Sequence, residues 1–517
     1  MKSKIFQLKN FAKVLIFFPL IFYFGKRSYI AFDEGFYALQ ARWILDKGNW
    51  VIPLWWDEYV LDRTIGLQFL IAKSQLLFGR NMFSAYLPTT IAAIIMLLIT
   101  YKLHEELFDK KYAIVSPLIL STTYLWFDYS HMGTQDIVFA SLVSTGLFSL
   151  VKIKSRDDKL YIFLFGFWIG LAFMMKTFLV AVPLLSLSPY LLTKKNIFIS
   201  KFFWIGLLTG FIPYLIWTYF INSYLDKNII FHLFDKFSDL SSKNNFTNPF
   251  YYYLWNMPLT FLPWSFLSIV GIICNSSEVK RNIYMLKIFP LFFVLILSIF
   301  STKTPYYPLQ ISSILSLNSY LGIRYLFDTK KYKLIFIFFT SRIIPFFSLT
   351  LIVFYFLFFK NNINLNIKEN TLLITGIIGF ALSWSFIHKN ISFKKILITL
   401  IIGPYILTSS LLQSGLFTDR SRELRETMEN ISTLDIVKNQ IIKVDKSGIK
   451  NAETYSKIIR ISLLTPNLGN SFNSINDLEP RELAWSTESE INTKNDVSHD
   501  VIFEDENLKP WKLIIKK

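Results

Sequence analysis

The sequence predicts an all-α polytopic membrane protein with about thirteen transmembrane helices and a small C-terminal α/β soluble domain. Of its 517 residues, 53% are hydrophobic and only 17% are charged, whereas a soluble chain carries about 25% charged residues. The mean hydropathy of +0.40 agrees with this. The composition excludes a cytosolic enzyme and a disordered protein, and a single cysteine excludes a disulfide scaffold.

Apolar windows long enough to cross a bilayer recur along the chain. A hydrocarbon core of about 30 Å needs about 20 apolar residues per helix. The first window follows basic residues and lacks a small-residue cleavage site, so we expect a retained signal anchor. The windows lie near 11–27, 82–104, 112–130, 134–153, 159–175, 177–194, 200–222, 255–275, 284–300, 305–323, 333–358, 371–387 and 394–414.

The loops between these windows differ in positive charge. With a cytoplasmic N-terminus, the loops on the cytoplasmic side hold most of the lysines and arginines, as the positive-inside rule expects. An odd number of spans then places the C-terminus outside. The same asymmetry accounts for the net charge of +18 without nucleic-acid binding. Lysines that carry it include Lys110, Lys111, Lys152, Lys154, Lys194, Lys195, Lys394 and Lys395.

Three polar segments stand apart from the apolar windows. Residues 1–415 form the expected transmembrane domain, and its long outer loops, 28–81 and 223–254, are expected to form the site. Residues 416–517 alternate polar and apolar residues around a helical stretch, which predicts a soluble extracytoplasmic α/β domain. The sequence has no Gly-rich phosphate loop, which argues against an ATP-driven pump.

The first outer loop carries an acidic pair, Asp33 and Glu34, directly after the first span. Carboxylates at a membrane boundary are costly to desolvate and need a reason to be there. The alternative is a solvated start of the loop. On charge alone this alternative is favoured, and the residues that follow change the balance.

The rest of this loop contains a predicted helix, four tryptophans and the charged pair Asp62-Arg63. Ala38, Ala41 and Ile44 recur at helical spacing, which predicts a helix lying in the membrane interface. An interfacial aromatic belt is expected from Trp43, Trp50, Trp55 and Trp56.

The acidic pair is the first of a series of motifs that are arranged in a fixed order along residues 30–325. They resemble the motifs of the membrane-embedded glycosyltransferases that use polyprenyl-phosphate sugars, a superfamily of GT-C fold that includes protein O-mannosyltransferases and the lipid A aminoarabinose transferase. The motifs are Asp33-Glu34, Tyr37, Ala41-Arg42, Gly48-Asn49-Trp50, Pro53, Asp62-Arg63, Phe78-Gly79, Pro88, Asp136, GLAFMMKTFLVAVP (170–183), NPFYYYLWNMPLTFLPW (248–264), and Ser301, Lys303, Tyr307 and Pro308.

This resemblance implies an enzyme of the bacterial inner membrane. Its donor would be a polyprenyl-phosphate sugar drawn from among the membrane lipids, and its acceptor lipid A, another glycolipid or a protein. The resemblance makes Asp33 the general base of an inverting transfer and Glu34 a second catalytic residue, which orients the acceptor or assists. The leaving phosphate would be bound by Arg63, Lys303 and Lys176, and Asp136 would hold Arg63 by a charge-assisted pair.

One motif departs from the family pattern and concerns a metal. The family's Glu-Lys-Pro-Pro is replaced by Asp62-Arg63-Thr64-Ile65, which keeps the charges and loses both prolines. In the aminoarabinose branch a histidine of the second outer loop helps to bind a metal. Here Asp235 holds that place, and His232 lies one turn away if the second loop is helical. The resemblance therefore allows a divalent ion that is bound by Asp62 together with Asp235 or His232.

Other interpretations stay open. Lys176 and Lys303 could extend from helix ends to the interface, and Asp136 could be a helix N-cap. A polytopic transporter or lipid-linked glycan flippase would fit the spans, although transporters tend to place charges at the bilayer midplane and to use inverted repeats. An oligosaccharide polymerase or ligase would share the donor type without the ordered pattern in the first loop.

Overall fold

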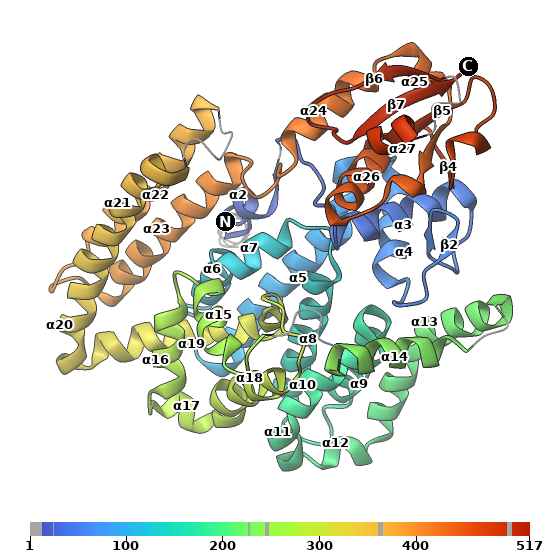
Figure 1. Cartoon of the computed structure of the whole chain (residues 1–517). Helices are drawn as coiled ribbons and strands as arrows, with labels where there is room; N and C mark the ends of the chain where they lie inside the picture. Colours follow the sequence, from blue (N-terminus) through green and yellow to red (C-terminus); the bar gives the residue numbers. More distant parts are fainter. Residues whose placement is uncertain (1–12, 24, 226–227, 243–247, 360–365, 494–498) are drawn as a thin grey trace, which may run out of the picture. The chain divides into compact units, whose positions relative to one another are not determined.

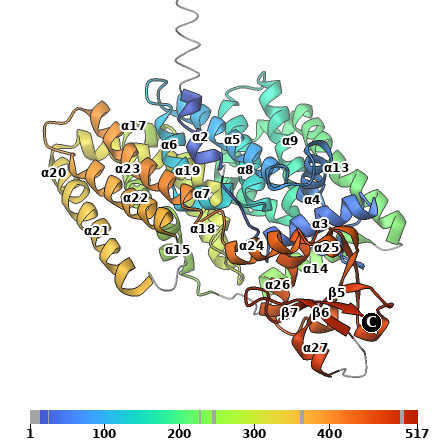
Figure 2. The ribbon, with the colours of Figure 1, turned by 90° about the horizontal axis from the view of Figure 1, so that it is seen from above.

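The computed structural model describes residues 13–23, 25–225, 228–242, 248–359, 366–493 and 499–517 (Figures 1 and 2). The chain forms two compact units. The helical unit comprises Met1–Gly25, Asp62–Thr64 and Thr89–Phe417. The mixed unit comprises Lys26–Leu61, Ile65–Pro88 and Thr418–Lys517.

The helical unit consists of helices joined by short connections. Its first half contains α2 (Phe18–Ile21), α5 (Met82–Leu107, whose first residues belong to the mixed unit), α6 (Val115–Ser121), α7 (Tyr124–Ser130), α8 (Gln135–Lys152), α9 (Lys159–Lys176), η1 (Thr177–Val180), α10 (Ala181–Ser186), α11 (Ser188–Thr193), α12 (Asn196–Ile199) and α13 (Lys201–Leu225). Its second half contains α14 (Ile229–Ser242), α15 (Tyr252–Thr260), α16 (Ser265–Ile273), α17 (Ser277–Arg281), η2 (Tyr284–Ile288), α18 (Phe289–Ile299), η3 (Tyr307–Ile311), α19 (Ser312–Asp328), α20 (Lys330–Phe338), η4 (Phe339–Ile343), α21 (Ile344–Phe354), η5 (Tyr355–Phe359), α22 (Ile367–Ser385) and α23 (Phe393–Gln413).

The described residues contain five helices long and apolar enough to cross a membrane, or up to seven if each of two bent pairs is one span. The chain is therefore a multi-pass membrane protein, as its composition predicts. The bent pairs are α7 with α8, at 117°, and α15 with α16, at 120°. The first predicted span, 11–27, lies partly outside the described residues. The five candidate spans, two of which join consecutive helical segments, are Met82–Leu107, Lys159–Ser186, Lys201–Leu225, Lys330–Phe358 and Phe393–Gln413.

Glycines set the distance between α9 and α13. A Cβ on Gly166 or Gly170 would lie 2.3 or 2.5 Å from backbone atoms of α13, and one on Gly206 or Gly210 would lie 2.0 or 2.2 Å from carbonyl oxygens of α9. Each helix thus presents two glycines four residues apart to the other. This small-xxx-small pattern lets helix backbones approach closely within a membrane. The glycine spacing explains why these two helices pack so tightly.

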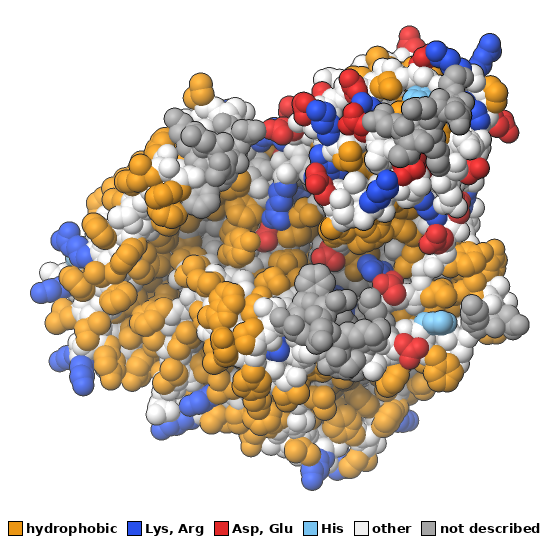
Figure 3. All heavy atoms as spheres, viewed as in Figure 1, with side chains coloured by type: hydrophobic (Ala, Val, Ile, Leu, Met, Phe, Trp, Pro, Cys, Tyr) orange, Lys and Arg blue, Asp and Glu red, His pale blue; other side chains and the backbone are white. Residues whose placement is uncertain are grey.

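The helical unit exposes large apolar side chains in rows, as a lipid-facing surface requires. On the face shown in Figure 3 they cover the region of α20 to α23. On α13 they recur at helical spacing on the side away from the glycines. That row consists of Trp204, Ile205, Leu208, Ile212, Leu215, Ile216, Tyr219 and Phe220.

The mixed unit is built around one five-stranded sheet with the order β4-β3-β5-β7-β6. The strand β3 pairs in parallel with β4 and β5, whereas β7 pairs antiparallel with β5 and β6. The strands and short hairpin are β1 (Leu54–Trp55), β2 (Glu58–Tyr59), β3 (Ile442–Asp445), β4 (Leu468–Phe472), β5 (Leu483–Thr487), β6 (His499–Phe503) and β7 (Trp511–Lys516). The helices are α3 (Glu34–Lys47), α4 (Gly66–Phe78), α24 (Arg422–Ile431), α25 (Asp435–Asn439), η6 (Lys446–Gly448), α26 (Ala452–Leu464), η7 (Ile475–Asp477) and α27 (Glu488–Thr493).

The core of the mixed unit joins the first outer loop to the C-terminal segment. Leu39, Trp43 and Trp56 are buried in one cluster with strand residues such as Val444 and Trp485. The α/β character of residues 416–517 is present, but the compact unit around it also takes in Lys26–Leu61 and Ile65–Pro88. The first loop therefore supplies part of a protein core.

This core corrects the interfacial interpretation of the first loop. Trp43 and Trp56 are each 1% exposed, so they are core residues and the predicted aromatic belt is wrong for both. The helix α3 is buried from Gly35 to Ile44 with the exception of Phe36. Its apolar spacing reflects packing within the mixed unit, because a helix in a membrane interface and a helix in a core show the same periodicity.

Candidate active site

Asp136 and Lys176 meet at neighbouring helix ends of the helical unit. Lys176 Nζ lies 2.6 Å from Asp136 Oδ1, and the two side chains are 14% and 12% exposed. Asp136 is in the first turn of α8, where Thr134 holds the N-cap position. Lys176 ends α9, because Thr177 has φ +41° and ψ −126°, a conformation that no helix continues.

This pair corrects one prediction and bears on two of the alternatives. Asp136 pairs with Lys176, where the sequence predicted Arg63 as its partner. It is also not an N-cap, since Thr134 holds that position, and the Lys176 ammonium is held by Asp136. The reason is the packing of α8 against α9, which brings the start of one helix to the end of the other.

Aromatic rings complete the surroundings of Lys176. Its Nζ lies 5.0 Å from the ring centroid of Tyr306 and 5.8 Å from that of Tyr307. Both distances fall within the range of cation–π attraction. The Tyr306 ring also packs on Tyr129, with centroids 5.5 Å apart. The motif at 301–308 therefore lies against Lys176, as expected of residues that share a site.

The acidic-basic pair of the first loop reaches the same helix end. Arg63 Nε and Nη2 donate to the two carboxylate oxygens of Asp62 at 3.0 and 2.9 Å. The next residue, Thr64, donates from Oγ1 to the carbonyl of Met175 at 3.4 Å. Because Met175 precedes Lys176, residues 62–64 lie beside the Lys176–Asp136 pair.

Lys303 is buried, and its ammonium group is surrounded by main-chain carbonyl oxygens. It is 5% exposed, and its Nζ donates to the carbonyls of Asn248 and Phe300 at 3.1 and 2.5 Å. Burial lowers the pKa of Lys303 below its ordinary value of 10.5. The alternative of a lysine that extends to the interface is therefore wrong. The Tyr253 hydroxyl fixes the next residue by hydrogen bonds to the backbone of Thr304.

In the mixed unit, Asp33 and Glu34 have opposite environments. Asp33 is exposed and has φ +56° and ψ −80°, a strained backbone that is rare for a residue other than glycine. Glu34 is 2% exposed and accepts from the Ile30 N–H at 2.8 Å and from Tyr86. Burial and then the charge of Glu34 raise the pKa of Tyr29 above its ordinary value. Glu34 thus holds the turn that presents Asp33.

Arg42 has a structural role that the sequence does not show. It is 3% exposed, and its guanidinium donates to the carbonyls of Ser462, Thr465 and Pro466 at 2.9, 2.7 and 2.8 Å. Burial lowers the pKa of Arg42 to about 10. These carbonyls lie at and after the end of α26, where helical acceptors lack partners. In the sequence, the only signal for a role of Arg42 was its place in the Ala41-Arg42 motif.

The expected metal ligands are not assembled in this structure. Among the described residues, no three His, Cys, Asp or Glu side chains lie close enough together to hold an ion. Asp62 is engaged by Arg63, while His232 and Asp235 are exposed on α14. Phe234 of that helix packs on Phe178, two residues after Lys176, with ring centroids 5.5 Å apart. The metal therefore stays a prediction.

Comparison with known proteins gives a consistent picture. Residues 62–219 match the family described as dolichyl-phosphate-mannose-protein mannosyltransferase. An uncharacterized protein of Aquifex aeolicus (strain VF5) is 25% identical over 58% of this chain and 61% of its own length. An undecaprenyl phosphate-alpha-4-amino-4-deoxy-L-arabinose arabinosyl transferase of Shewanella sediminis (strain HAW-EB3) is 25% identical over 52% of this chain and 50% of its own. A protein of that name from Wigglesworthia glossinidia brevipalpis is 28% identical over 59% and 57%.

These alignments span about half the length of the curated relatives. The fold is matched more completely. The crystal structure of ArnT from Cupriavidus metallidurans bound to undecaprenyl phosphate has a TM-score of 0.75, with 14% identity, over 100% of this chain and 98% of that one. Sequence and fold together confirm that this chain is similar to the GT-C membrane glycosyltransferases that use polyprenyl-phosphate sugars.

Proposed function

We propose that the chain is an integral membrane glycosyltransferase that moves a sugar from a polyprenyl-phosphate donor to an acceptor. One observation supports this most: Asp62-Arg63, Asp136, Lys176 and Tyr307, which belong to separate motifs, lie around the start of α8 and the end of α9. Cations and aromatic rings at a helix end suit a phosphate at headgroup depth. A transporter tends to place such charges near mid-span, whereas Asp136 lies in the first turn of α8 and Lys176 is the last residue of α9.

The proposed reaction is an inverting displacement. An acceptor oxygen attacks the anomeric carbon, the bond from that carbon to the phosphate oxygen breaks, and the lipid phosphate leaves with an added negative charge. Asp33 accepts the proton of an acceptor hydroxyl, because a carboxylate within hydrogen-bond reach can act as general base. Its exposure and strained backbone support this role, since strain of this kind clusters at active sites.

Arg63, Lys176 and Lys303 are proposed to stabilise the leaving phosphate. Fixed cations are worth most where charge develops and water is excluded. Lys303 is preorganised by main-chain oxygens, and Lys176 by Asp136 and two tyrosines. Asp136 and Glu34 are positioning residues in this scheme. A divalent ion at Asp62 with His232 or Asp235 would supply further charge neutralisation.

The proposal also includes the orientation of the chain in the membrane and the class of acceptor. We place the N-terminus in the cytoplasm and the C-terminal segment outside, in a bacterial inner membrane, with about thirteen spans. The acceptor is lipid A, another glycolipid or a protein. The relatives named as arabinosyl transferases favour an aminoarabinose-like sugar.

The purified protein in detergent tests the reaction class. It is given an undecaprenyl-phosphate sugar, with or without an extract of outer glycolipids, and the products are weighed by mass spectrometry. The proposal expects release of undecaprenyl phosphate and a matching gain of one sugar mass on an acceptor. Intact donor carried across a vesicle membrane, with no bond broken, would instead show a flippase.

A further inference from the structure

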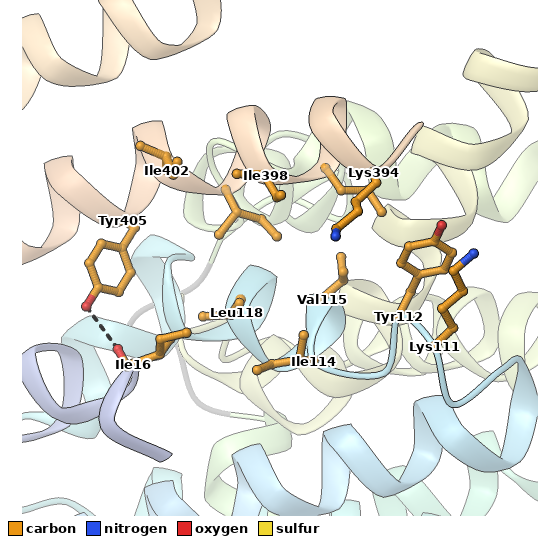
Figure 4. A pocket seen from close by; sticks show the side chains of 12 residues that line it. Ile16, Lys111, Tyr112, Ile114, Val115, Leu118, Lys394, Ile398, Ile402 and Tyr405 are labelled. Carbon is orange, nitrogen blue, oxygen red and sulfur yellow. Dashed lines mark hydrogen bonds between the residues drawn. The ribbon is translucent and has the colours of Figure 1, made fainter. Parts of the chain in front are cut away.

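An apolar groove opens in the helical unit between α6 and α23. It has a volume of about 560 Å³, which is within the usual range of roughly 300–1,000 Å³ for ligand pockets. Its walls are apolar, and Ile398 and Ile402 of α23 are 48% and 44% exposed. Figure 4 shows the lining residues between these helices, with the Tyr405 hydroxyl at one end donating to the carbonyl of Ile16 at 3.0 Å. Lining residues include Ile114, Val115, Leu118, Leu397 and Ile401.

The other end of the groove is basic. Lys111 and Lys394 line it together with Tyr112 (Figure 4). No carboxylate lines the groove, and within the described ranges neither lysine forms an ion pair with one. Lys394 also lies in the first turn of α23, so the positive end of a helix dipole adds to the two ammonium groups. The groove therefore combines an apolar channel with an anion-binding mouth.

The basic mouth lies near the C-terminal end of α8, opposite to the Lys176–Asp136 pair of the same unit. Lys111 follows the end of α5, where Glu106 pairs with Lys152, the last residue of α8. Asp136 lies in the first turn of that helix, which has 18 residues and so a length of about 27 Å. The two charged regions are thus separated by nearly the thickness of a bilayer core.

We propose that this groove binds an anionic phospholipid of the membrane leaflet on the Lys111 side. One acyl chain lies along the apolar wall between α6 and α23, and the phosphate is bound by Lys111 and Lys394. Charge complementarity identifies the headgroup, and the apolar lining identifies the tail. The donor lipid is not the expected occupant, because its phosphate must reach the opposite helix ends.

The test counts lipid molecules that remain on the detergent-purified protein by native mass spectrometry, with added phosphatidylglycerol or phosphatidylcholine. Lys111→Ala with Lys394→Ala removes the mouth. The matched control is Lys110→Ala with Lys395→Ala, which removes the same charge at neighbouring positions that do not line the groove. Ile398→Trp fills the channel, and Ile406→Trp adds the same ring at an exposed position of α23 outside the lining.

The expected result is tight retention of phosphatidylglycerol by the wild type and by both controls. The mouth variant should lose about thirtyfold in affinity, from about fivefold per lysine contact, and Ile398→Trp should retain no lipid at this site. Equal retention of phosphatidylcholine, equal loss in the Lys110/Lys395 control, or unchanged binding by Ile398→Trp would each overturn the proposal. Preferential retention of undecaprenyl phosphate over phosphatidylglycerol would also overturn it.

Discussion

Lys176 is held by a carboxylate and two aromatic rings, so its position is specified before any ligand arrives. Both members of the Lys176–Asp136 pair are mostly buried. Removing one partner of such a pair leaves an uncompensated charge in a poorly solvated place, which costs more than the pair itself contributes.

Asp136→Asn and Lys176→Met should therefore each lower the free energy of unfolding by about 1 to 3 kcal/mol. The double variant should be more stable than the sum of the two losses predicts, because it leaves no single charge behind. Thermal unfolding in detergent measures this. Strictly additive losses would show that the two side chains do not act as a pair.

Lys303 predicts how binding of the donor phosphate depends on pH. Burial lowers the pKa of its ammonium, so the positive charge is lost at a lower pH than in an ordinary lysine. The dissociation constant of a polyprenyl phosphate should therefore rise at a pH below 10.5, the ordinary lysine value. Lys303→Arg should move that rise to higher pH, since an arginine stays protonated. The same pH profile in both proteins would exclude Lys303 from phosphate binding.

At the scale of elements, Arg42 ties α3 to the end of α26. Its planar fork reaches several carbonyls at once, which the single ammonium of a lysine cannot do. Arg42→Lys should cost about 2 to 3 kcal/mol of stability in the mixed unit.

Arg80→Lys is the matched control for Arg42→Lys. Arg80 is more than one third exposed and pairs with Asp46, so its exchange should change stability by less than about 1 kcal/mol. Protease susceptibility of the mixed unit, measured against urea concentration, distinguishes the two. Equal effects of the two variants would mean that the carbonyl contacts of Arg42 contribute little.

The glycines between α9 and α13 predict a second effect at this scale. Gly206→Leu would place its side chain on the carbonyl of Phe163, 2.0 Å from the new Cβ. The helices must then separate, at a cost of at least about 2 kcal/mol. Ser223→Leu adds the same side chain on the exposed surface of α13 and should leave the melting temperature unchanged. A Gly206→Leu protein as stable as that control would contradict the close contact.

The positions of helices were easier to predict from the sequence than the burial of individual side chains. Every apolar window beyond the first contains helix in the structure, because length and hydropathy are local properties of the sequence. The burial of Trp43 and Trp56 was not predictable, since their partners come from residues more than 350 positions later, such as Val444 and Trp485. Interfacial and core tryptophans look alike in a single sequence.

At the scale of the whole molecule, the motifs predicted neighbours better than they predicted partners. Asp62-Arg63, Asp136, Lys176 and the tyrosine motif were expected to share a site, and the helical unit brings them to one helix end. The predicted Asp136–Arg63 pair was wrong, because Arg63 and Lys176 carry the same charge and the sequence alone does not distinguish them as partners of Asp136. Only the packing of α8 on α9 selects Lys176 for Asp136.

Transfer by the Asp33→Asn variant tests the central claim most directly. With an undecaprenyl-phosphate sugar and acceptor in detergent, its turnover should fall by about 10²- to 10⁴-fold, the usual contribution of a general base, while donor binding is kept. Asp57→Asn, at an exposed acid of the same loop that bonds Ser471, should transfer sugar like the wild type. Unchanged turnover by Asp33→Asn would contradict the account.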